Sequence, residues 1–185
     1  MILKKLPKIH ITDRVVFVPP TWADFPEVYD ILSNPKVMQY VTTGARSKSE
    51  AIAEFSSWNE HREKHGFGPY LVRCKREGNL IGFAKLYLSD RDPSVQVGYC
   101  VQEHLWGLGL GTEIAKGCLE VGFQYLQEEE LVAFARIENK ASRRILEKVG
   151  MQCQTDNFRQ ENRVYARYSI DAAQYFHIQG LRQAS

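Results

Sequence analysis

The sequence predicts an α/β fold in which helices cover both sides of a mixed β-sheet. Helical patterns fill the first third of the chain, a run of short apolar strands follows, and strands then alternate with helices toward the end. The chain has 185 residues, enough for one domain with a sizeable core, and it shows no repeat, low-complexity run or Pro/Gly-rich linker. We therefore expect a single domain over residues 1–185.

The first third of the chain predicts one strand followed by two helices. The strand is a β-branched run that two consecutive prolines end. Thr21 and Asp24 are spaced like a capping box, which predicts the start of the first helix, and Asn34–Pro35 ends it. Either Ser47 or Ser49 caps the second helix. The expected spans are residues 14–18 for the strand, and 21–32 and 47–66 for the helices.

Three strands are expected in the middle of the chain. Two apolar segments are separated by the turn signal Glu77–Gly78–Asn79, which predicts a hairpin. A turn-rich stretch from Ser89 to Pro93 precedes the next strand. The expected strands cover residues 70–75, 80–88 and 94–101.

The last third of the chain predicts alternating strands and helices. A glycine-rich loop, Trp106–Gly111, leads into a helix whose apolar residues recur at helical spacing. Asn139 is placed to cap a later helix that runs to Val149, and Gly150 follows as its left-handed stop. Strands are expected over residues 131–137, 152–158 and 163–170, with a short helix after Asp171.

Composition excludes several classes of protein. Lys plus Arg total 24 against 22 Asp plus Glu, so the net charge of +2 gives no argument for a nucleic-acid or membrane partner. No stretch approaches the roughly 18 apolar residues that a membrane-spanning helix needs, and the start Met1–Lys8 lacks the apolar run of a secretory signal. The four cysteines form no C-x-x-C pair and lie in apolar segments, which indicates reduced thiols, no metal site and a cytoplasmic protein.

The glycine-rich loop points to a phosphate-binding site. Gly107, Gly109 and Gly111 let the backbone approach a ligand, and the helix beside them directs unpaired N–H groups and a positive dipole end at it. This arrangement suits a phosphate or pyrophosphate. The dinucleotide fingerprint requires glycine where Thr112 stands, and the phosphate loop requires Gly-Lys where Gly111 is followed by Thr112 and Glu113, so both motifs fit poorly.

Three blocks of sequence occur in a characteristic order: Val-Gly-Tyr-Cys-Val at 97–101, Trp-Gly-Leu-Gly-Leu-Gly-Thr-Glu at 106–113, and Asn-Lys-Ala-Ser-Arg-Arg-Ile-Leu-Glu-Lys-Val-Gly-Met at 139–151. With these blocks the chain resembles the GNAT superfamily of N-acetyltransferases, and most closely the branch that includes the bacterial ribosomal-protein N-acetyltransferases. The resemblance spans nearly the whole chain. It implies the α/β (α+β) GNAT fold, with a mixed, mostly antiparallel central sheet and helices on both faces.

The resemblance also implies which residues hold acetyl-CoA, the acetyl donor substrate. The family's pyrophosphate loop falls on Trp106 to Gly111, where Trp106 replaces Gln or Arg, as is common in this branch. Val101 matches the strand end whose backbone holds the pantetheine arm, and Asn139 matches a polar residue that contacts this arm. The implied acetyl-CoA site consists of Val101, Trp106, Gly107, Leu108, Gly109, Leu110, Gly111, Thr112 and Asn139.

Ser142 is the catalytic residue that the resemblance implies, because it matches the position where this branch places a hydroxyl near the cofactor sulfur. Many family members carry a tyrosine acid seven residues after the asparagine. Leu146 stands there in this chain, which leaves Ser142 or a water to protonate the thiolate. Gln96 occupies a position that is often Glu in this branch and cannot act as a base, so the base is unassigned. Positioning two substrates supplies most of the rate, because a thioester is already activated.

Several of these residues also have a structural interpretation. His61 and His65 are four residues apart, a spacing that suits a metal pair, but they lie in a charged helix end that we expect to be solvated. His104 precedes the glycine loop and is expected on the surface. Ser142 lies in the first turn of its helix, where serine often bonds backbone N–H groups, so this role stands beside the catalytic one.

Three functions are consistent with the sequence. The first is acetyl transfer from acetyl-CoA to a protein or peptide N-terminal amine, by direct attack in a ternary complex. The second is acetylation of a small amine, such as a polyamine or an aminoglycoside. The third is a GNAT-like module that binds acyl-CoA without turnover. The expected partners are acetyl-CoA and an amine acceptor, bound to a monomer or a homodimer.

Overall fold

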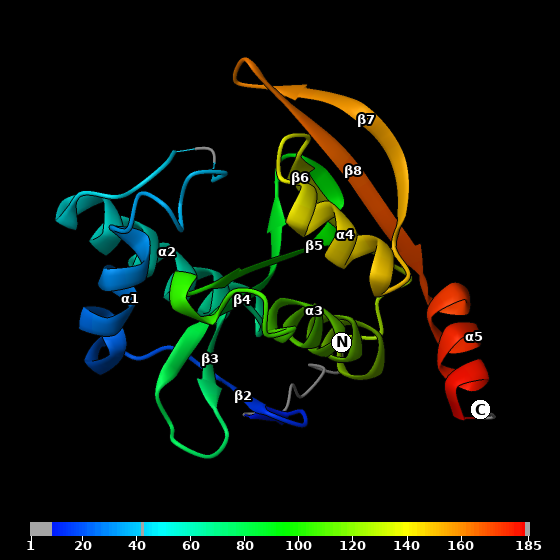
Figure 1. The fold of residues 1–185 in the computed structure, drawn as a ribbon, viewed down its shortest axis with the longest axis horizontal. Helices are drawn as coiled ribbons and strands as arrows, with labels where there is room; N and C mark the ends of the chain where they lie inside the picture. Colours follow the sequence, from blue (N-terminus) through cyan, green and yellow to red (C-terminus); the bar gives the residue numbers. More distant parts are fainter. Residues whose placement is uncertain (1–8, 42, 184–185) are drawn as a thin grey trace.

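The computed structural model describes residues 9–41 and 43–183, which form an eight-stranded sheet in the order β1-β2-β3-β4-β5-β6-β8-β7 (Figure 1). Among the described strands, neighbours run antiparallel except for the parallel pair β5 and β6. This confirms the expected mixed, mostly antiparallel sheet. The strands are β1 (His10–Ile11), β2 (Val15–Val18), β3 (Tyr70–Cys74), β4 (Leu80–Ser89), β5 (Asp92–Val101), β6 (Glu130–Arg136), β7 (Gln152–Gln160) and β8 (Arg163–Asp171).

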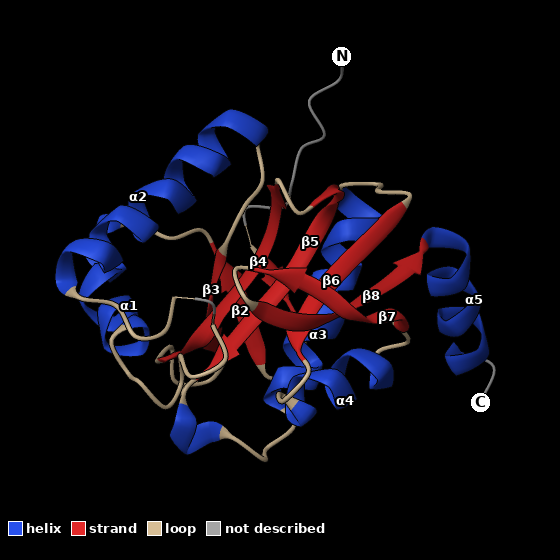
Figure 2. Cartoon of the chain, turned by 90° about the horizontal axis from the view of Figure 1, so that it is seen from above, coloured by secondary structure: helices blue, strands red, loops and turns tan. Residues whose placement is uncertain are grey.

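Helices pack on both faces of this sheet. Figure 2 shows α1 and α2 on one side and α3 and α4 on the other. The buried side chains form two core clusters that follow the same division. One cluster joins α1 and α2 to the sheet, and the other joins α3, α4 and α5 to it. The α-helices of the described chain are α1 (Phe25–Leu32), α2 (Lys48–His65), α3 (Leu110–Glu120), α4 (Lys140–Lys148) and α5 (Ala172–Gln183).

The helix ends follow from local sequence. Ser47 and Glu50 form a capping box at the start of α2, with the Ser47 N–H donating to the Glu50 carboxylate at 2.8 Å. Gly66 ends this helix in the left-handed region at φ 77°. Thr21 and Asp24 also form a capping box, although it opens a 3₁₀ turn that precedes α1.

Two strand features differ from expectation. Strand β1 was not expected, because it has only two residues and therefore carries little alternating pattern. Strands β4 and β5 extend into the turn-rich stretch, so that the turn is confined to residues 90–91. Asp92 explains this extension, because it pairs with Ser89 across the hairpin and accepts a hydrogen bond from Arg167 at 2.8 Å.

The expected short helix after the last strand is present as α5, which has 12 residues. It is anchored by Tyr175, which is 2% exposed and stacks on Phe123 with ring centroids 4.7 Å apart. The start Met1–Lys8, which lacks the pattern of a secretory signal, lies outside the described residues. Within the described chain, no helix is both long enough and apolar enough to span a membrane.

Candidate functional site

The parallel strands β5 and β6 pair at only two positions before they separate. Val95 pairs with Leu131 and Gln96 pairs with Val132, and no later residue of β5 pairs with β6 in the described chain. Strand β5 nevertheless stays paired with β4 as far as Val101. The sheet therefore opens between the C-terminal halves of β5 and β6.

A cavity of about 1170 Å³ lies at this opening, bounded by Gly98–Val101 on β5 and Ala133–Arg136 on β6. Its lining comes from both faces of the sheet, with Lys85 on the side of α2 and Leu146 on the side of α4. The opening thus connects the two faces, so that two molecules can approach the same point from opposite sides. The volume also exceeds the roughly 300–1,000 Å³ of an ordinary ligand pocket.

The residues implied as the acetyl-CoA site and the catalytic residue gather around this cavity. Those that line it are Val101, Trp106, Gly107, Gly109, Leu110, Gly111, Thr112, Asn139 and Ser142. Leu108 lies outside the lining and is 57% exposed. The backbone carbonyl of Leu108 helps to hold the loop, because it accepts a hydrogen bond from Arg14 at 2.9 Å.

The glycine-rich loop opens α3 with a geometry that suits an anion. Gly109 is the N-cap residue at φ 77°, and Gly107 is also left-handed at φ 80°, so both positions need glycine. The first backbone bond of the helix runs from Glu113 N–H to the Gly109 carbonyl. The N–H groups of Gly111 and Thr112 therefore have no acceptor within the helix, and both residues line the cavity. Such donors at a helix N-terminus suit a phosphate group.

Arg14 and Glu113 hold this loop, and sequence reasoning missed both. The Arg14 guanidinium donates to Glu113 Oε2 at 2.6 Å, and the Arg14 backbone N–H donates to Oε1 at 2.7 Å. Burial raises the pKa of the Glu113 carboxyl, but hydrogen bonds from Thr12 and Arg14 outweigh it, so that the pKa is lowered overall. Arg14 Nη2 lies 3.6 Å from the position that a Cβ atom at Gly109 would take, so the guanidinium, paired with Glu113, borders the start of α3.

The end of β5 is held close to its neighbours. Trp106 Nε1 donates to the Val101 carbonyl at 2.8 Å, which folds the glycine-rich loop back onto the strand. On the other side, a Cβ atom at Gly82 would lie 1.9 Å from the Cys100 carbonyl oxygen. Gly82 is therefore required for the close approach of β4 to β5, and sequence reasoning missed it as well.

The start of α4 brings three polar groups together. Asn139 Oδ1 accepts the Ser142 N–H at 3.0 Å, which confirms the expected helix cap. The Ser142 hydroxyl lies 3.1 Å from the hydroxyl of Tyr99, which also lines the cavity. Burial raises the pKa of Tyr99, and its hydrogen bond with Ser142 only partly offsets this. Leu146 is 1% exposed, so the position of the missing tyrosine acid is apolar.

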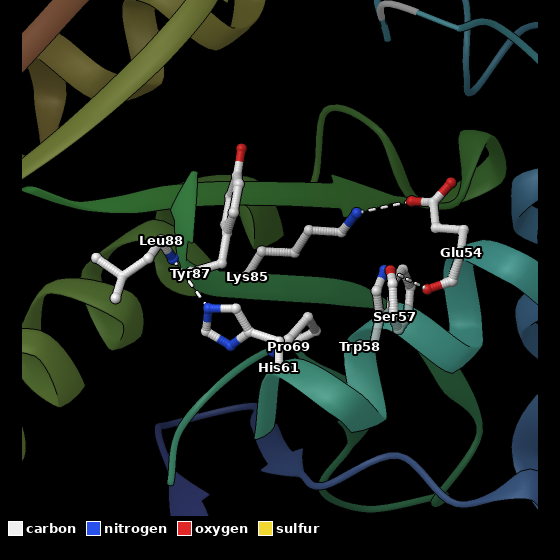
Figure 3. A pocket seen from close by; sticks show the side chains of 8 residues that line it. All are labelled: Glu54, Ser57, Trp58, His61, Pro69, Lys85, Tyr87 and Leu88. Atoms are coloured by element: carbon white, nitrogen blue, oxygen red, sulfur yellow. Dashed lines mark hydrogen bonds and ion pairs between the residues drawn. The ribbon is translucent and has the colours of Figure 1, made fainter. Parts of the chain in front are cut away.

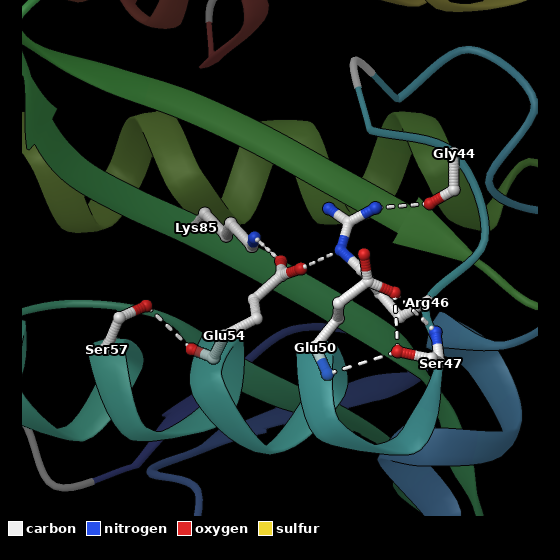
Figure 4. Close-up of polar contacts among 7 residues, drawn as sticks. All are labelled: Gly44, Arg46, Ser47, Glu50, Glu54, Ser57 and Lys85. Atoms are coloured by element: carbon white, nitrogen blue, oxygen red, sulfur yellow. Dashed lines mark hydrogen bonds and ion pairs between the residues drawn. The ribbon is translucent and has the colours of Figure 1, made fainter.

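An ion triad stands on the α2 side of the cavity (Figure 4). Glu54 accepts hydrogen bonds from Arg46 Nε and from Lys85 Nζ, each at 2.8 Å. The side chains of Arg46, Glu54 and Lys85 are 10%, 16% and 22% exposed. Burial raises the pKa of Glu54, but the two cations outweigh it and lower the pKa overall, so the carboxylate is ionised at neutral pH.

Gln96 does not reach the cavity. It is 1% exposed, and its side-chain amide donates to the Ser89 hydroxyl. The cavity therefore has no carboxylate base at the strand position where this branch often carries Glu.

A smaller groove of about 340 Å³ lies beside the cavity, between α2 and β4 (Figure 3). The two share Glu54, Lys85 and Tyr87 in their linings. His61 borders the groove. It was expected on a solvated helix face, but both of its ring nitrogens form hydrogen bonds within the protein. Its Nε2 accepts the Leu88 N–H at 3.0 Å, so Nδ1 carries the proton and donates to the Phe67 carbonyl at 3.0 Å. Both ring nitrogens are thus occupied, which leaves none for a metal.

Comparison with known proteins identifies relatives over most of the chain. The family described as acetyltransferase (GNAT) domain matches residues 14–152. The uncharacterized protein YkkB of Bacillus subtilis is 30% identical over 145 residues, which cover 76% of this chain and 83% of YkkB.

Two solved structures have a similar fold. The spermidine N-acetyltransferase of Vibrio cholerae, in complex with CoA and spermine, gives a TM-score of 0.74 at 17% identity, covering 88% of this chain and 98% of that one. RimL, a ribosomal L7/L12 alpha-N-protein acetyltransferase in complex with coenzyme A, gives a TM-score of 0.72 at 14% identity, covering 88% and 97%. At these identities the likeness establishes the shared fold and leaves the acceptor open.

Proposed function

Because the chain belongs to the GNAT acetyltransferase family, we propose that it acetylates the N-terminal amine of a protein or peptide, in the manner of the ribosomal-protein N-acetyltransferase branch. The chain is an N-acetyltransferase, and acetyl-CoA is its acetyl donor. The observation that carries the proposal is the cavity through the sheet, which has the N-terminus of α3 at one end and, among the described lining residues, no histidine and only Asp90 as a carboxylate outside an ion pair at the other.

The donor half of the cavity fits acetyl-CoA. The pyrophosphate takes the N–H groups of Gly111 and Thr112, which have no acceptor within α3. The pantetheine arm then follows the open end of β5 at Val101 toward Asn139. The helix cap engages Asn139 Oδ1, so the side-chain NH₂ group is the donor for a pantetheine carbonyl. Along this path the thioester would lie beside Ser142.

The acceptor half explains the choice of an N-terminal amine. Glu54 is a carboxylate of this half, but two cations bind it and lower its pKa, so it is a poor proton acceptor. An amine must therefore arrive largely neutral. The pKa of an N-terminal amine is about 7.7–8.0 against about 10.4 for a lysine, so its neutral fraction near pH 7 is on the order of several hundredfold larger. A site whose central carboxylate is held by two cations thus favours N-terminal amines.

The charges of the lining also disfavour a polyamine. A polyamine carries several positive charges and needs carboxylates that are free to bind them. Arg46 and Lys85 neutralise Glu54, and Arg136 lies 3.2 Å from Glu138. Asp90 is the remaining carboxylate of the described lining. The acceptor half therefore suits an amine of low total charge.

Release of free CoA thiol from acetyl-CoA tests this proposal directly. The panel contains a peptide with a free N-terminal amine, the same peptide with a blocked N-terminus and one lysine, spermidine, and an aminoglycoside. We expect the first peptide to give the highest kcat/KM. Preference for spermidine or the aminoglycoside would instead make the chain a small-amine acetyltransferase. Binding of acetyl-CoA without thiol release from any acceptor would indicate a non-catalytic module.

A further inference from the structure

Tyr99 is a half-buried tyrosine whose hydroxyl group reaches the start of α4. It lies on β5, on the face of the sheet that packs against α3 and α4, and it lines the cavity together with Ser142. Its hydroxyl lies 3.1 Å from Ser142 Oγ and 3.3 Å from the Ser142 carbonyl oxygen. The sequence pattern marked Tyr99 only as a strand residue.

The surrounding hydrogen bonds favour donation from Tyr99 to Ser142 Oγ. The Ser142 carbonyl lies inside α4, where the N–H four residues later is its regular partner. The Ser142 N–H is engaged by Asn139 at 3.0 Å. The serine hydroxyl is thus the acceptor without a competing donor, and it is also the closer one. When it accepts from Tyr99, its own proton points away from Tyr99 and is available to a group in the cavity that Ser142 lines.

The protonation state of Tyr99 supports the same direction of the hydrogen bond, from Tyr99 to Ser142. Burial raises the pKa of its hydroxyl, and the bond with Ser142 lowers it by less. Tyr99 therefore remains protonated, and remains a donor, across the working range of pH. Leu146, four residues beyond Ser142, is buried and apolar and offers no competing group.

We propose that Tyr99 is a positioning residue for acetyl transfer, whose hydroxyl group orients the Ser142 hydroxyl so that it donates a hydrogen bond to the thioester sulfur. Tyr99 and Ser142 together then supply the hydrogen bond to sulfur that the leucine at position 146 cannot donate. The inference rests on the proposed function, because Ser142 acts in this way only if the thioester lies beside it.

The protons of the step balance without transfer from either hydroxyl. The amine nitrogen attacks the thioester carbonyl carbon, the C–N bond forms, and the C–S bond breaks with its electron pair leaving on sulfur. The proton that the amine loses passes through solvent and neutralises the CoA thiolate. A thiol has a pKa of about 8.5, so a thiolate does not deprotonate a serine or a half-buried tyrosine. Ser142 therefore stabilises the developing charge on sulfur by its hydrogen bond alone.

A double-mutant cycle tests the pair with the full-length enzyme and the best acceptor of the thiol-release panel. We expect Tyr99→Phe to lower kcat about tenfold, as loss of a hydrogen bond to a charged group does, with little change in KM for acetyl-CoA. Ser142→Ala should lower kcat by at least as much. Adding Tyr99→Phe to Ser142→Ala should then have no further effect, because the hydroxyl that Tyr99 orients is gone.

Tyr168 provides a matched control. Its hydroxyl accepts from Arg143 at 3.1 Å and donates to Glu147 at 2.9 Å, so it also bonds α4, but it does not line the cavity. Tyr168→Phe should therefore alter the unfolding temperature without lowering kcat. Ser142→Thr, which keeps a hydroxyl, should remain sensitive to Tyr99→Phe.

Two results would overturn the inference while the wild-type enzyme is active. One is an unchanged kcat in a folded Tyr99→Phe variant. The other is an equal fold-loss from Tyr99→Phe with and without the Ser142 hydroxyl, which would mean that Tyr99 only supports the fold. An inactive wild-type protein that binds acetyl-CoA would overturn the proposed function itself, so wild-type activity distinguishes the two failures.

Discussion

The side-chain oxygen of Asn139 accepts the backbone N–H of Ser142 at 3.0 Å, while Asn139 also lines the cavity. One residue thus caps α4 with its carbonyl oxygen, while its NH₂ group takes no part in the cap. These two groups can be separated by substitution, because aspartate retains the oxygen and loses the NH₂ group.

We predict that Asn139→Ala loses about 0.5–2 kcal/mol of unfolding free energy through the cap and also binds acetyl-CoA more weakly. Asn139→Asp keeps the cap and should retain most of the stability, but it should bind acetyl-CoA more weakly as well. Denaturant unfolding and titration calorimetry measure the two effects. Wild-type affinity in both variants would remove Asn139 from the acetyl-CoA site.

Gly109 permits a test of the proposed anion site by charge alone. Asparagine and aspartate both tolerate the left-handed conformation at φ 77° better than other residues do, and both are good N-caps. We expect Gly109→Asp to bind acetyl-CoA at least about tenfold more weakly than Gly109→Asn, because its carboxylate repels the phosphates. Thermal unfolding checks that both variants fold. Equal affinities would show that the pyrophosphate binds elsewhere.

Glu54 should matter for stability because it neutralises two half-buried cations. Glu54→Gln leaves Arg46 and Lys85 without their shared carboxylate, and we expect a loss of about 3 kcal/mol in unfolding free energy. Because the pKa of Glu54 is lowered in the folded protein, its contribution is present above the ordinary value of 4.5 and is lost as the pH falls through the folded pKa. Glu138→Gln, at a more exposed ion pair, is the control and should leave the unfolding temperature almost unchanged.

His61 should also make stability fall with falling pH, but at a higher pH than Glu54 does. Burial lowers its pKa, and its neutral form is the one that bonds both Phe67 and Leu88. Its contribution is therefore full above the ordinary value of 6.5 and is lost as the pH falls below it. We expect His61→Gln to flatten the fall in unfolding temperature between about pH 7 and about pH 5. His104→Gln, at an exposed site, should leave this slope as it is in the wild type.

The features that sequence could predict are those that nearby residues determine. The cap of α2 at Ser47, one of the two serines that the sequence allowed, the cap at Asn139 and the left-handed Gly150 at φ 102° all depend on residues within one helical turn. The glycine-rich loop belongs to the same class, since its conformation follows from Gly107 and Gly109 and from the helix that begins beside them.

The features that sequence could not predict depend on contacts between distant segments. The bonds between Arg14 and Glu113 join positions 99 residues apart, and no local pattern marks either residue. The contact between Tyr99 and Ser142 spans 43 residues. His61 appeared solvated because its neighbours in sequence are charged, whereas its ring is held between segments that only the fold brings together.

The most direct measurement is the position of the acetyl group on a peptide that carries one free N-terminal amine and one lysine. The peptide is incubated with acetyl-CoA and the enzyme, and tandem mass spectrometry locates the modification. We predict acetylation of the N-terminal amine, with Gly109→Asp much slower than Gly109→Asn. Acetylation of the lysine alone, or an unmodified peptide alongside rapid acetylation of spermidine, would contradict it.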